Sequence, residues 1–116
     1  MAFSNYLSNE ILDHVFSGNA FTAPSNYYVA LYTVAPTASG GGTEVTGGGY
    51  VRRAATFTTS ATQSTNQSAV EFPTATAAYG NVVAAAVLDA TSGGNLLAFA
   101  NLTAAKNIAI GDVLRI

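Results

Sequence analysis

Few side chains of this protein can take part in acid, base or nucleophilic chemistry. Only 9% of the 116 residues are charged, and the chain has one histidine and no cysteine. An ordinary globular domain is about 25% charged. The acidic, basic and histidine side chains are Glu10, Asp13, His14, Glu44, Arg52, Arg53, Glu71, Asp89, Lys106, Asp112 and Arg115. Because catalysis at neutral pH depends on such groups, the composition favours a protein that binds or assembles.

Glu10, Asp13 and His14 form the one cluster that joins acids to the histidine. On a helix these positions are neighbours and could hold a divalent metal ion. Structural metal sites usually need further ligands, and the chain has no second histidine. His14 also has no nucleophile that the sequence pairs with it. We therefore interpret the cluster as a solvated helix face and predict neither a metal site nor a catalytic base.

Two glycine triplets, 40–42 and 47–49, invite comparison with loops that bind phosphate. Such loops lead into a helix, and the P-loop carries a Gly-Lys-Ser/Thr run there. The first triplet continues into Thr43 and Glu44 without a lysine. We expect a flexible surface loop and no cofactor.

Hydrolysis of a glycosidic bond needs two carboxylates about 5–9 Å apart. The acids in or beside predicted loops are Glu44, Glu71, Asp89 and Asp112. The sequence singles out no pair, and Asp89 and Asp112 read as turn residues. A polysaccharide-cleaving enzyme is therefore the weakest alternative, and we predict no catalytic residues.

Tyrosines give a modest signal for binding. A tyrosine joins apolar area to a hydroxyl, a combination enriched at protein interfaces and suited to stacking on sugars. The candidates are Tyr27, Tyr28, Tyr32, Tyr50 and Tyr79. Core packing is the competing role for each of them.

Arg52 and Arg53 are the only adjacent basic residues. On a strand they would point to opposite faces, so we expect one to pair with a carboxylate across a subunit contact and the other to be solvated. The net charge of −2 provides no basic surface for nucleic acid. No apolar run approaches the roughly 20 residues that cross a bilayer, and the start of the chain lacks the pattern of a secretory signal.

Residues 4–17 are predicted to form the one helix. Ser4 is a suitable N-cap and Gly18 a suitable terminator. The apolar stripe recurs every fourth residue, at Leu7, Ile11 and Val15, and Leu12 and Phe16 widen it. A single short amphipathic helix must lie against a sheet or a neighbouring subunit.

After Pro24 the apolar pattern has a period of two, which is typical of strands. The expected strands are 27–33, 50–58, 69–72, 82–89, 96–101, 107–110 and 113–116. The first is apolar on both faces, so we expect it to be covered on both sides. The predicted connections are a long Gly-rich loop over 34–49, a polar link over 59–68 and a turn over 90–95. The fold class is therefore mainly β, an antiparallel β-sandwich or barrel with one N-terminal α-helix, in a single domain of residues 1–116 with its β part over 27–116.

The apolar segment 113–116 closes the sequence inside a predicted strand. Such an end docks either into its own sheet or into that of a partner. We expect a partner.

Six segments spread along the chain share their order and spacing with a known pattern: 7–16 (LSNEILDHVF), 28–36 (YVALYTVAP), 41–45 (GGTEV), 48–52 (GGYVR), 72–77 (FPTATA) and 92–97 (SGGNLL). In these segments the sequence resembles a family of small bacteriophage tail fibre proteins. The resemblance implies a virion structural protein with a β-sandwich body; similar folds serve as tail fibres, head fibres and capsid cement proteins. None of the segments is a catalytic motif. Relatives typically continue through another strand beyond the position of Ile116, which argues against a self-contained monomer.

We therefore predict a non-enzymatic bacteriophage virion protein, a homotrimer on the exterior of the capsid or tail. It would pack against itself and against other virion proteins such as the major capsid or tail proteins. The expected contact residues are Leu7, Ile11, Val15, Tyr50, Arg52, Leu114 and Ile116. The 34–49 loop is expected to become ordered against the shell or a neighbour. The alternative is a receptor-binding module that recognises a host-surface glycan through loop tyrosines.

Overall fold

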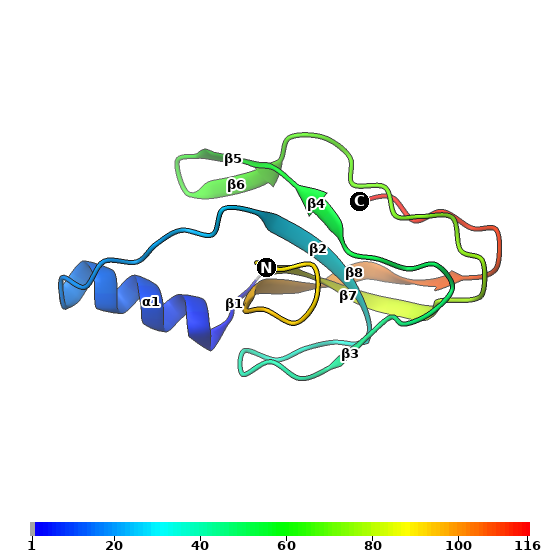
Figure 1. The fold of residues 1–116 in the computed structure, drawn as a ribbon, viewed down its shortest axis with the longest axis horizontal. Helices are drawn as coiled ribbons and strands as arrows, with labels where there is room; N and C mark the ends of the chain where they lie inside the picture. The colour runs from blue at the N-terminus through cyan, green and yellow to red at the C-terminus, as the bar shows by residue number, and fades with distance from the viewer. Residues whose placement is uncertain (1) are drawn as a thin grey trace.

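An antiparallel sheet forms the body of the molecule, and one helix projects from its end (Figure 1). The computed structural model describes residues 2–116. The elements are β1 (Ala2–Phe3), α1 (Asn5–Phe16), β2 (Tyr27–Val34), β3 (Thr43–Glu44), β4 (Arg53–Ala55), β5 (Phe57–Ser60), β6 (Gln63–Asn66), β7 (Gly80–Leu88) and β8 (Leu96–Ile108). All strand pairs are antiparallel. The prediction of a mainly β fold with an N-terminal helix is confirmed.

The main sheet has the order β1-β8-β7-β2-β3, and β4 pairs with another part of β2. The apolar β2 pairs with β7 along most of its length, from Tyr28↔Leu88 to Tyr32↔Ala84. Its Ala30 and Leu31 are fully buried, on opposite faces of the strand. The prediction that this strand is covered on both sides is correct.

Two apolar clusters lie on the sheet. The larger contains Val29, Leu31, Val45, Val70, Phe72, Ala75, Tyr79, Val82, Ile108 and Leu114. It is closed by the loop segments around residues 70–79 and 109–116 and by the small β5–β6 sheet, which contributes Phe57. The smaller is rich in alanine and contains Ala30, Tyr32, Ala84, Ala86 and Leu88.

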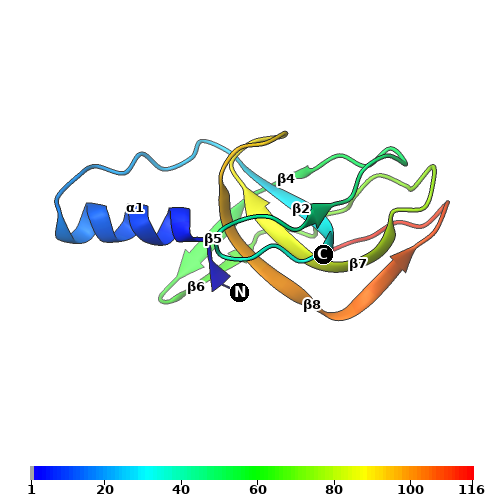
Figure 2. The same ribbon diagram turned by 90° about the horizontal axis from the view of Figure 1, so that it is seen from below.

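Helix α1 is fixed at its base. The Ser4 side chain accepts a hydrogen bond from the Leu7 amide at 3.0 Å, as the predicted N-cap should, and the Ser4 amide donates to the Leu97 carbonyl at 2.9 Å. The Asn5 amide donates to Ala38 at 2.8 Å. From this root the helix extends about 18 Å away from the sheet, which contributes to the elongated 49 × 27 × 24 Å shape (Figure 2).

The segment between residues 34 and 68 differs most from its prediction. The 34–49 loop contains β3 and buries Val45 against the main sheet, so it is ordered within the chain itself. The strand expected over 50–58 is instead two short strands, β4 and β5, and the polar link over 59–68 contains β6. The β5–β6 hairpin was missed because almost all of its residues are polar and exposed, so no apolar alternation marks it.

The late hairpin is confirmed, but β8 continues to Ile108 and absorbs part of the strand expected over 107–110. Between Lys106 and Asn101 its register against β7 shifts, so extra β8 residues bulge outward and the strand bends sharply (Figure 2).

The end of the sequence pairs within the chain, which corrects the expectation of a partner. The Val70 amide donates to the Ile116 carbonyl at 2.7 Å, and the Ile116 amide donates back to Val70 at 2.8 Å. The expected strands over 69–72 and 113–116 reduce to one ladder bridge between Glu71 and Arg115. Leu114 is buried in the larger cluster beside Phe72, so the apolar character of this end serves the chain's own core.

Candidate functional site

A partly buried ion pair lies at the edge of the main sheet. Arg52 donates from Nε and Nη2 to the two carboxylate oxygens of Glu44, both at 2.8 Å. The Arg52 side chain is only 7% exposed and that of Glu44 23%. Nη1 of Arg52 also donates to the carbonyls of Ala90 and Gly93, both at 2.8 Å. Arg52 therefore links β3 to the turn between β7 and β8.

Tyr50 completes this cluster from the opposite side. Its hydroxyl donates to Glu44 Oε2 at 2.7 Å and accepts a hydrogen bond from the Leu31 amide at 3.0 Å. Leu31 lies between the parts of β2 that pair with β3 and with β4. The Tyr50 hydroxyl thus provides the hydrogen-bond acceptor for the Leu31 amide, at the point of β2 between its pairing with β3 and its pairing with β4. We call Glu44, Tyr50 and Arg52 the edge cluster.

The edge cluster shifts the pKa of each of its members. Burial favours the neutral form of Glu44, but the hydrogen bonds from Arg52 and Tyr50 and the charge of Arg52 outweigh it, so the pKa of this carboxyl is lowered. The hydrogen bond to Glu44 raises the pKa of Arg52. Burial, reinforced by the bond to Glu44, raises the pKa of Tyr50. At neutral pH the cluster is one ion pair with a neutral tyrosine.

A cavity of about 420 Å³ lies beside the edge cluster, where the base of α1 meets two loops. We call it the polar cavity. Its walls come from separate parts of the chain and are formed by Ser4, Asn5, Tyr6, Tyr32, Ala38, Ser39, Gly40, Gly41, Arg52, Leu88, Gly93, Gly94, Asn95 and Leu96. They combine two aromatic rings with hydroxyl, amide and backbone groups.

Tyr32 is an enclosed polar side chain of this cavity whose hydroxyl forms no hydrogen bond with the described residues. It is 6% exposed, and its hydroxyl makes no hydrogen bond within residues 2–116. It is nevertheless not cut off from solvent, because no fully buried side-chain oxygen of the described chain lacks a partner. Burial, together with the charge of Glu44, raises the pKa of Tyr32, so the hydroxyl stays protonated and can donate.

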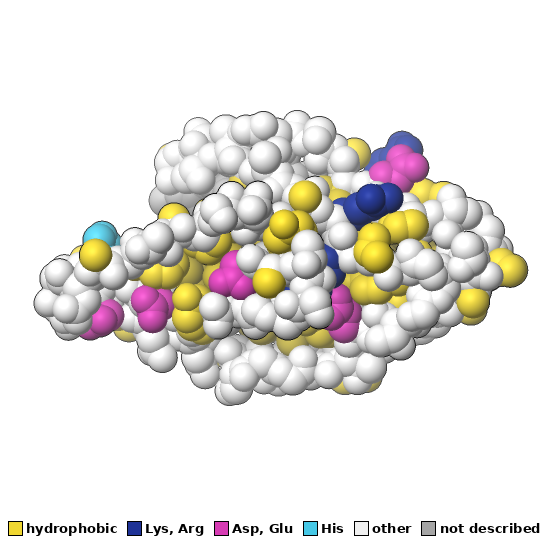
Figure 3. All heavy atoms as spheres, viewed as in Figure 1, with side chains coloured by type: hydrophobic (Ala, Val, Ile, Leu, Met, Phe, Trp, Pro, Cys, Tyr) yellow, Lys and Arg dark blue, Asp and Glu magenta, His cyan; other side chains and the backbone are white. Residues whose placement is uncertain are grey.

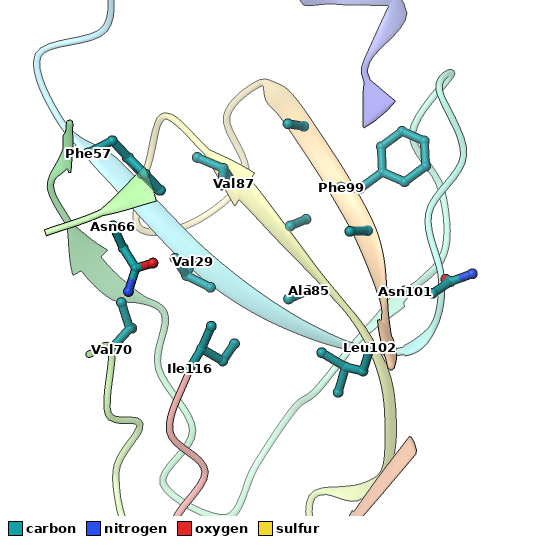
Figure 4. A pocket seen from close by; sticks show the side chains of 13 residues that line it. Val29, Phe57, Asn66, Val70, Ala85, Val87, Phe99, Asn101, Leu102 and Ile116 are labelled. Atoms are coloured by element: carbon teal, nitrogen blue, oxygen red, sulfur yellow. The ribbon is translucent and has the colours of Figure 1, made fainter. Parts of the chain in front are cut away.

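An apolar groove lies on the other face of the sheet. It joins two cavities, of about 210 and 260 Å³, which share Phe57, Val87 and Ala98. In Figure 4 its floor is formed by β2 and β7, with Phe57, Val70 and Ile116 on one side and Leu102 on the other. No residue that lines either cavity is charged.

Helix α1 carries a second uncovered apolar surface. Leu12, Val15 and Phe16 are 53%, 62% and 80% exposed, and no residue of the helix is buried. These positions are spaced i, i+3 and i+4, so they form one stripe, which we call the α1 stripe. Leu7 and Ile11 are half-buried instead, nearer the base.

The remaining predicted site residues have local structural roles. Asp13 accepts two hydrogen bonds from Asn19 Nδ2, both at 3.0 Å, and His14 Nδ1 lies 3.1 Å from the Asn19 carbonyl. These contacts hold the segment after α1 against the helix. Within residues 2–116 no three acidic or histidine side chains gather as a metal site.

The carboxylates of Glu71, Asp89 and Asp112 each interact with a different partner and do not form a pair with one another. Glu71 pairs with Arg115 on the surface. Asp89 accepts from the amide and side chain of Asn95, and Asp112 accepts from the Ala109 amide at 2.9 Å. Both act in turns, as predicted.

The two adjacent arginines do not share a strand as expected, because β4 begins at Arg53. Arg52 finds its carboxylate in its own chain and not across a subunit contact. Arg53 is exposed and donates to the Glu71 carbonyl at 3.1 Å.

The predicted contact residues fall into two groups. Val15 and Ile116 are exposed, at 62% and 40%. Leu7 and Ile11 are half-buried, Leu114 lies in the core, and Tyr50 and Arg52 belong to the edge cluster. Leu12 and Phe16, which the sequence places on the same apolar stripe but which are not among the predicted contact residues, are also exposed. Sequence reasoning missed Tyr6 and Asn95 at the polar cavity, for which no local signal exists.

Comparison with known proteins agrees with the fibre resemblance. The family model Gp80, described as podophage GP4 fiber I protein gp80, matches residues 2–116. No curated protein matches the chain. No helix within residues 2–116 is long and apolar enough to cross a membrane. The match covers nearly the whole sequence, and the chain belongs to the Gp80 family of podophage fibre proteins, which are components of the virion.

Proposed function

We propose that this protein is a non-enzymatic structural subunit on the exterior of the phage particle. It works as a homotrimer. Its copies pack against one another and against other virion proteins through apolar surfaces. The α1 stripe carries this proposal. Leu12, Val15 and Phe16 are held on a helix whose base is fixed by backbone hydrogen bonds, so they cannot fold back onto their own sheet.

The apolar groove supplies a matching surface on a second copy. Burial of apolar area is the main driving force for association, and neither the α1 stripe nor the groove contains a charge that would have to be desolvated. When the α1 stripe of one copy lies in the groove of the next, the contact is heterologous. Such a contact forms a closed ring when the rotation from one copy to the next is a whole fraction of a full turn.

The charge distribution is compatible with the same head-to-tail arrangement. Figure 3 shows acidic groups on the helical arm and both acidic and basic groups on the body. Arg52 and Arg115 on the body are paired with Glu44 and Glu71, whereas Arg53 forms no ion pair within residues 2–116. A neighbouring copy can bring Glu10 or Asp13 of its α1 toward Arg53.

Phage particles test this function. A phage that encodes Phe16→Asp should lose the protein from purified particles, because a charge replaces the most exposed side chain of the stripe. His14→Asp introduces the same charge on the opposite, exposed side of the helix; it is the matched control and should leave incorporation unchanged. Equal amounts of both variants in purified particles, measured by quantitative mass spectrometry, would contradict the proposed role of the stripe.

A second candidate function is recognition of a host-surface glycan. The polar cavity favours it, since it offers aromatic and hydrogen-bonding groups in one concave site. Tyr50, the loop tyrosine expected to serve this role, instead uses its hydroxyl in the edge cluster, where it donates to Glu44 and accepts from the Leu31 amide. Recognition at this cavity would therefore depend on Tyr6 and Tyr32.

A further inference from the structure

We propose that the polar cavity is a binding site for a neutral saccharide unit, with the Tyr32 hydroxyl as its central hydrogen-bonding group. The inference rests on the second of the two functions proposed above and gives it a site and a ligand class. It is independent of the α1 stripe and of how copies associate.

The first support is the unused hydrogen-bonding capacity of Tyr32. A hydroxyl can donate once and accept twice, yet this one has no partner within residues 2–116 while its side chain is 6% exposed. Tyr50 and Tyr79, by contrast, donate to Glu44 at 2.7 Å and to the Pro73 carbonyl at 2.9 Å. The hydroxyl is within reach of solvent in the cavity, so a ligand there can accept from it and donate to it without displacing any hydrogen bond of the protein.

The second support is the electrostatic character of the walls. Arg52 is the one charged side chain that lines the cavity, and Glu44 neutralises it. Four of its N–H groups donate to Glu44, Ala90 and Gly93, which leaves one Nη2 hydrogen free to bind a ligand oxygen. A phosphate or carboxylate would need uncompensated positive charge, which this cavity lacks. A neutral ligand is favoured.

The third support is the mixture of ring and amide groups. Tyr6 is 36% exposed and presents an aromatic ring at the rim, while Asn5, Ser39 and Asn95 bring side-chain donors and acceptors. Four glycines, Gly40, Gly41, Gly93 and Gly94, leave the backbone of both loops accessible. A sugar matches this set, because its hydroxyls both donate and accept and its C–H faces pack on aromatic rings.

The site is tested by titrating the purified, isotope-labelled protein with neutral monosaccharides. The probes are D-glucose, D-galactose, L-rhamnose and N-acetyl-D-glucosamine, and the readout is the set of amide resonances of the four cavity glycines. At least one probe should shift these resonances in the wild type. Tyr32→Phe, which removes only the hydroxyl, should weaken that binding roughly 5- to 10-fold.

Tyr28→Phe is the matched control. Tyr28 lies four residues earlier on β2, on the same face of the strand, and does not line the cavity. It should bind as the wild type does. The inference is overturned if no probe shifts the glycine resonances, if Tyr32→Phe binds as tightly as the wild type, or if inorganic phosphate binds there and no sugar does.

Failure of the site and failure of the recognition function are separable. Adsorption of phage to host cells measures the function. If a sugar binds at the cavity but phage with Tyr32→Phe adsorb normally, the saccharide site stands and glycan recognition of the host is contradicted. If Tyr32→Phe reduces adsorption while no probe binds, the saccharide assignment is contradicted.

Discussion

The partly buried pair of Glu44 and Arg52 is the residue contact on which the edge of the sheet most depends. Removing one partner of a buried pair leaves the other charge uncompensated, at a cost of about 3–5 kcal/mol. Arg52→Met keeps the unbranched stem but also releases the Ala90 and Gly93 carbonyls. We expect it to lower the free energy of unfolding by about 3 kcal/mol in urea titrations.

The same substitution at Arg115 is the control, since that arginine also pairs with a glutamate but its side chain is 64% exposed. An exposed pair contributes about 0–1 kcal/mol. If Arg115→Met costs as much as Arg52→Met, burial is not what makes the edge cluster important.

Glu44 also makes the stability of the folded protein depend on pH. Its pKa in the folded protein lies below the ordinary value of a glutamate carboxyl, so the unfolded chain binds more protons between the two values. The stabilisation is therefore complete above the unfolded pKa and is lost as the pH falls through the folded one. Urea unfolding between about pH 3 and pH 6 should show a steeper loss of stability for the wild type than for Glu44→Gln. Equal slopes would contradict this account.

At the scale of elements, Gly48 determines how closely the loop before β4 approaches the segment before β7. Its φ is +62°, and a Cβ there would lie 2.6 Å from the Ala77 carbonyl and 3.1 Å from the Tyr79 ring. Gly47 has a φ of +75° but open space around it. Both alanine variants bear the strain of positive φ, and Gly48→Ala adds overpacking of about 1–3 kcal/mol.

Thermal unfolding of the two variants measures that difference directly. Gly48→Ala should melt clearly below Gly47→Ala. Equal melting temperatures would show that the loop containing Gly48 can move away from Ala77 without loss of stability, which would contradict this account.

The elements that could be predicted from the sequence are those with a local signal. Helix α1 has a cap and an apolar period, and β2, β7 and β8 have apolar runs bounded by turn residues. The polar β5–β6 hairpin has neither, and β3 lies between glycine triplets. The polar cavity could not be predicted, because it exists only where α1, β2 and the 90–95 turn meet.

Sequence patterns also indicate what is apolar without showing what covers it. The end of the chain was expected on a partner, yet it pairs with residues 70–72 of its own chain. The edge cluster likewise unites Glu44 and Arg52, eight residues apart, within one chain. The helical pattern also predicts a stripe that includes Leu12, Val15 and Phe16, but it does not tell that these three are exposed while Leu7 and Ile11 are half-buried.

At the scale of the whole molecule, the single chain leaves two apolar surfaces uncovered, the α1 stripe and the apolar groove. Exposed aromatic side chains present about 150–250 Å² each when fully accessible, and Phe16 on α1 and Phe3 on β1 are 80% and 56% exposed. In the proposed ring the α1 stripe of each copy lies in the groove of the next copy, so that both apolar surfaces are buried.

The mass of the purified protein in solution tests this central claim most directly. Sedimentation equilibrium at micromolar concentration should give three times the chain mass of 11.8 kDa, and Phe16→Asp should shift the protein toward the single-chain mass. A wild-type protein that remains at 11.8 kDa across the whole concentration range would contradict the account.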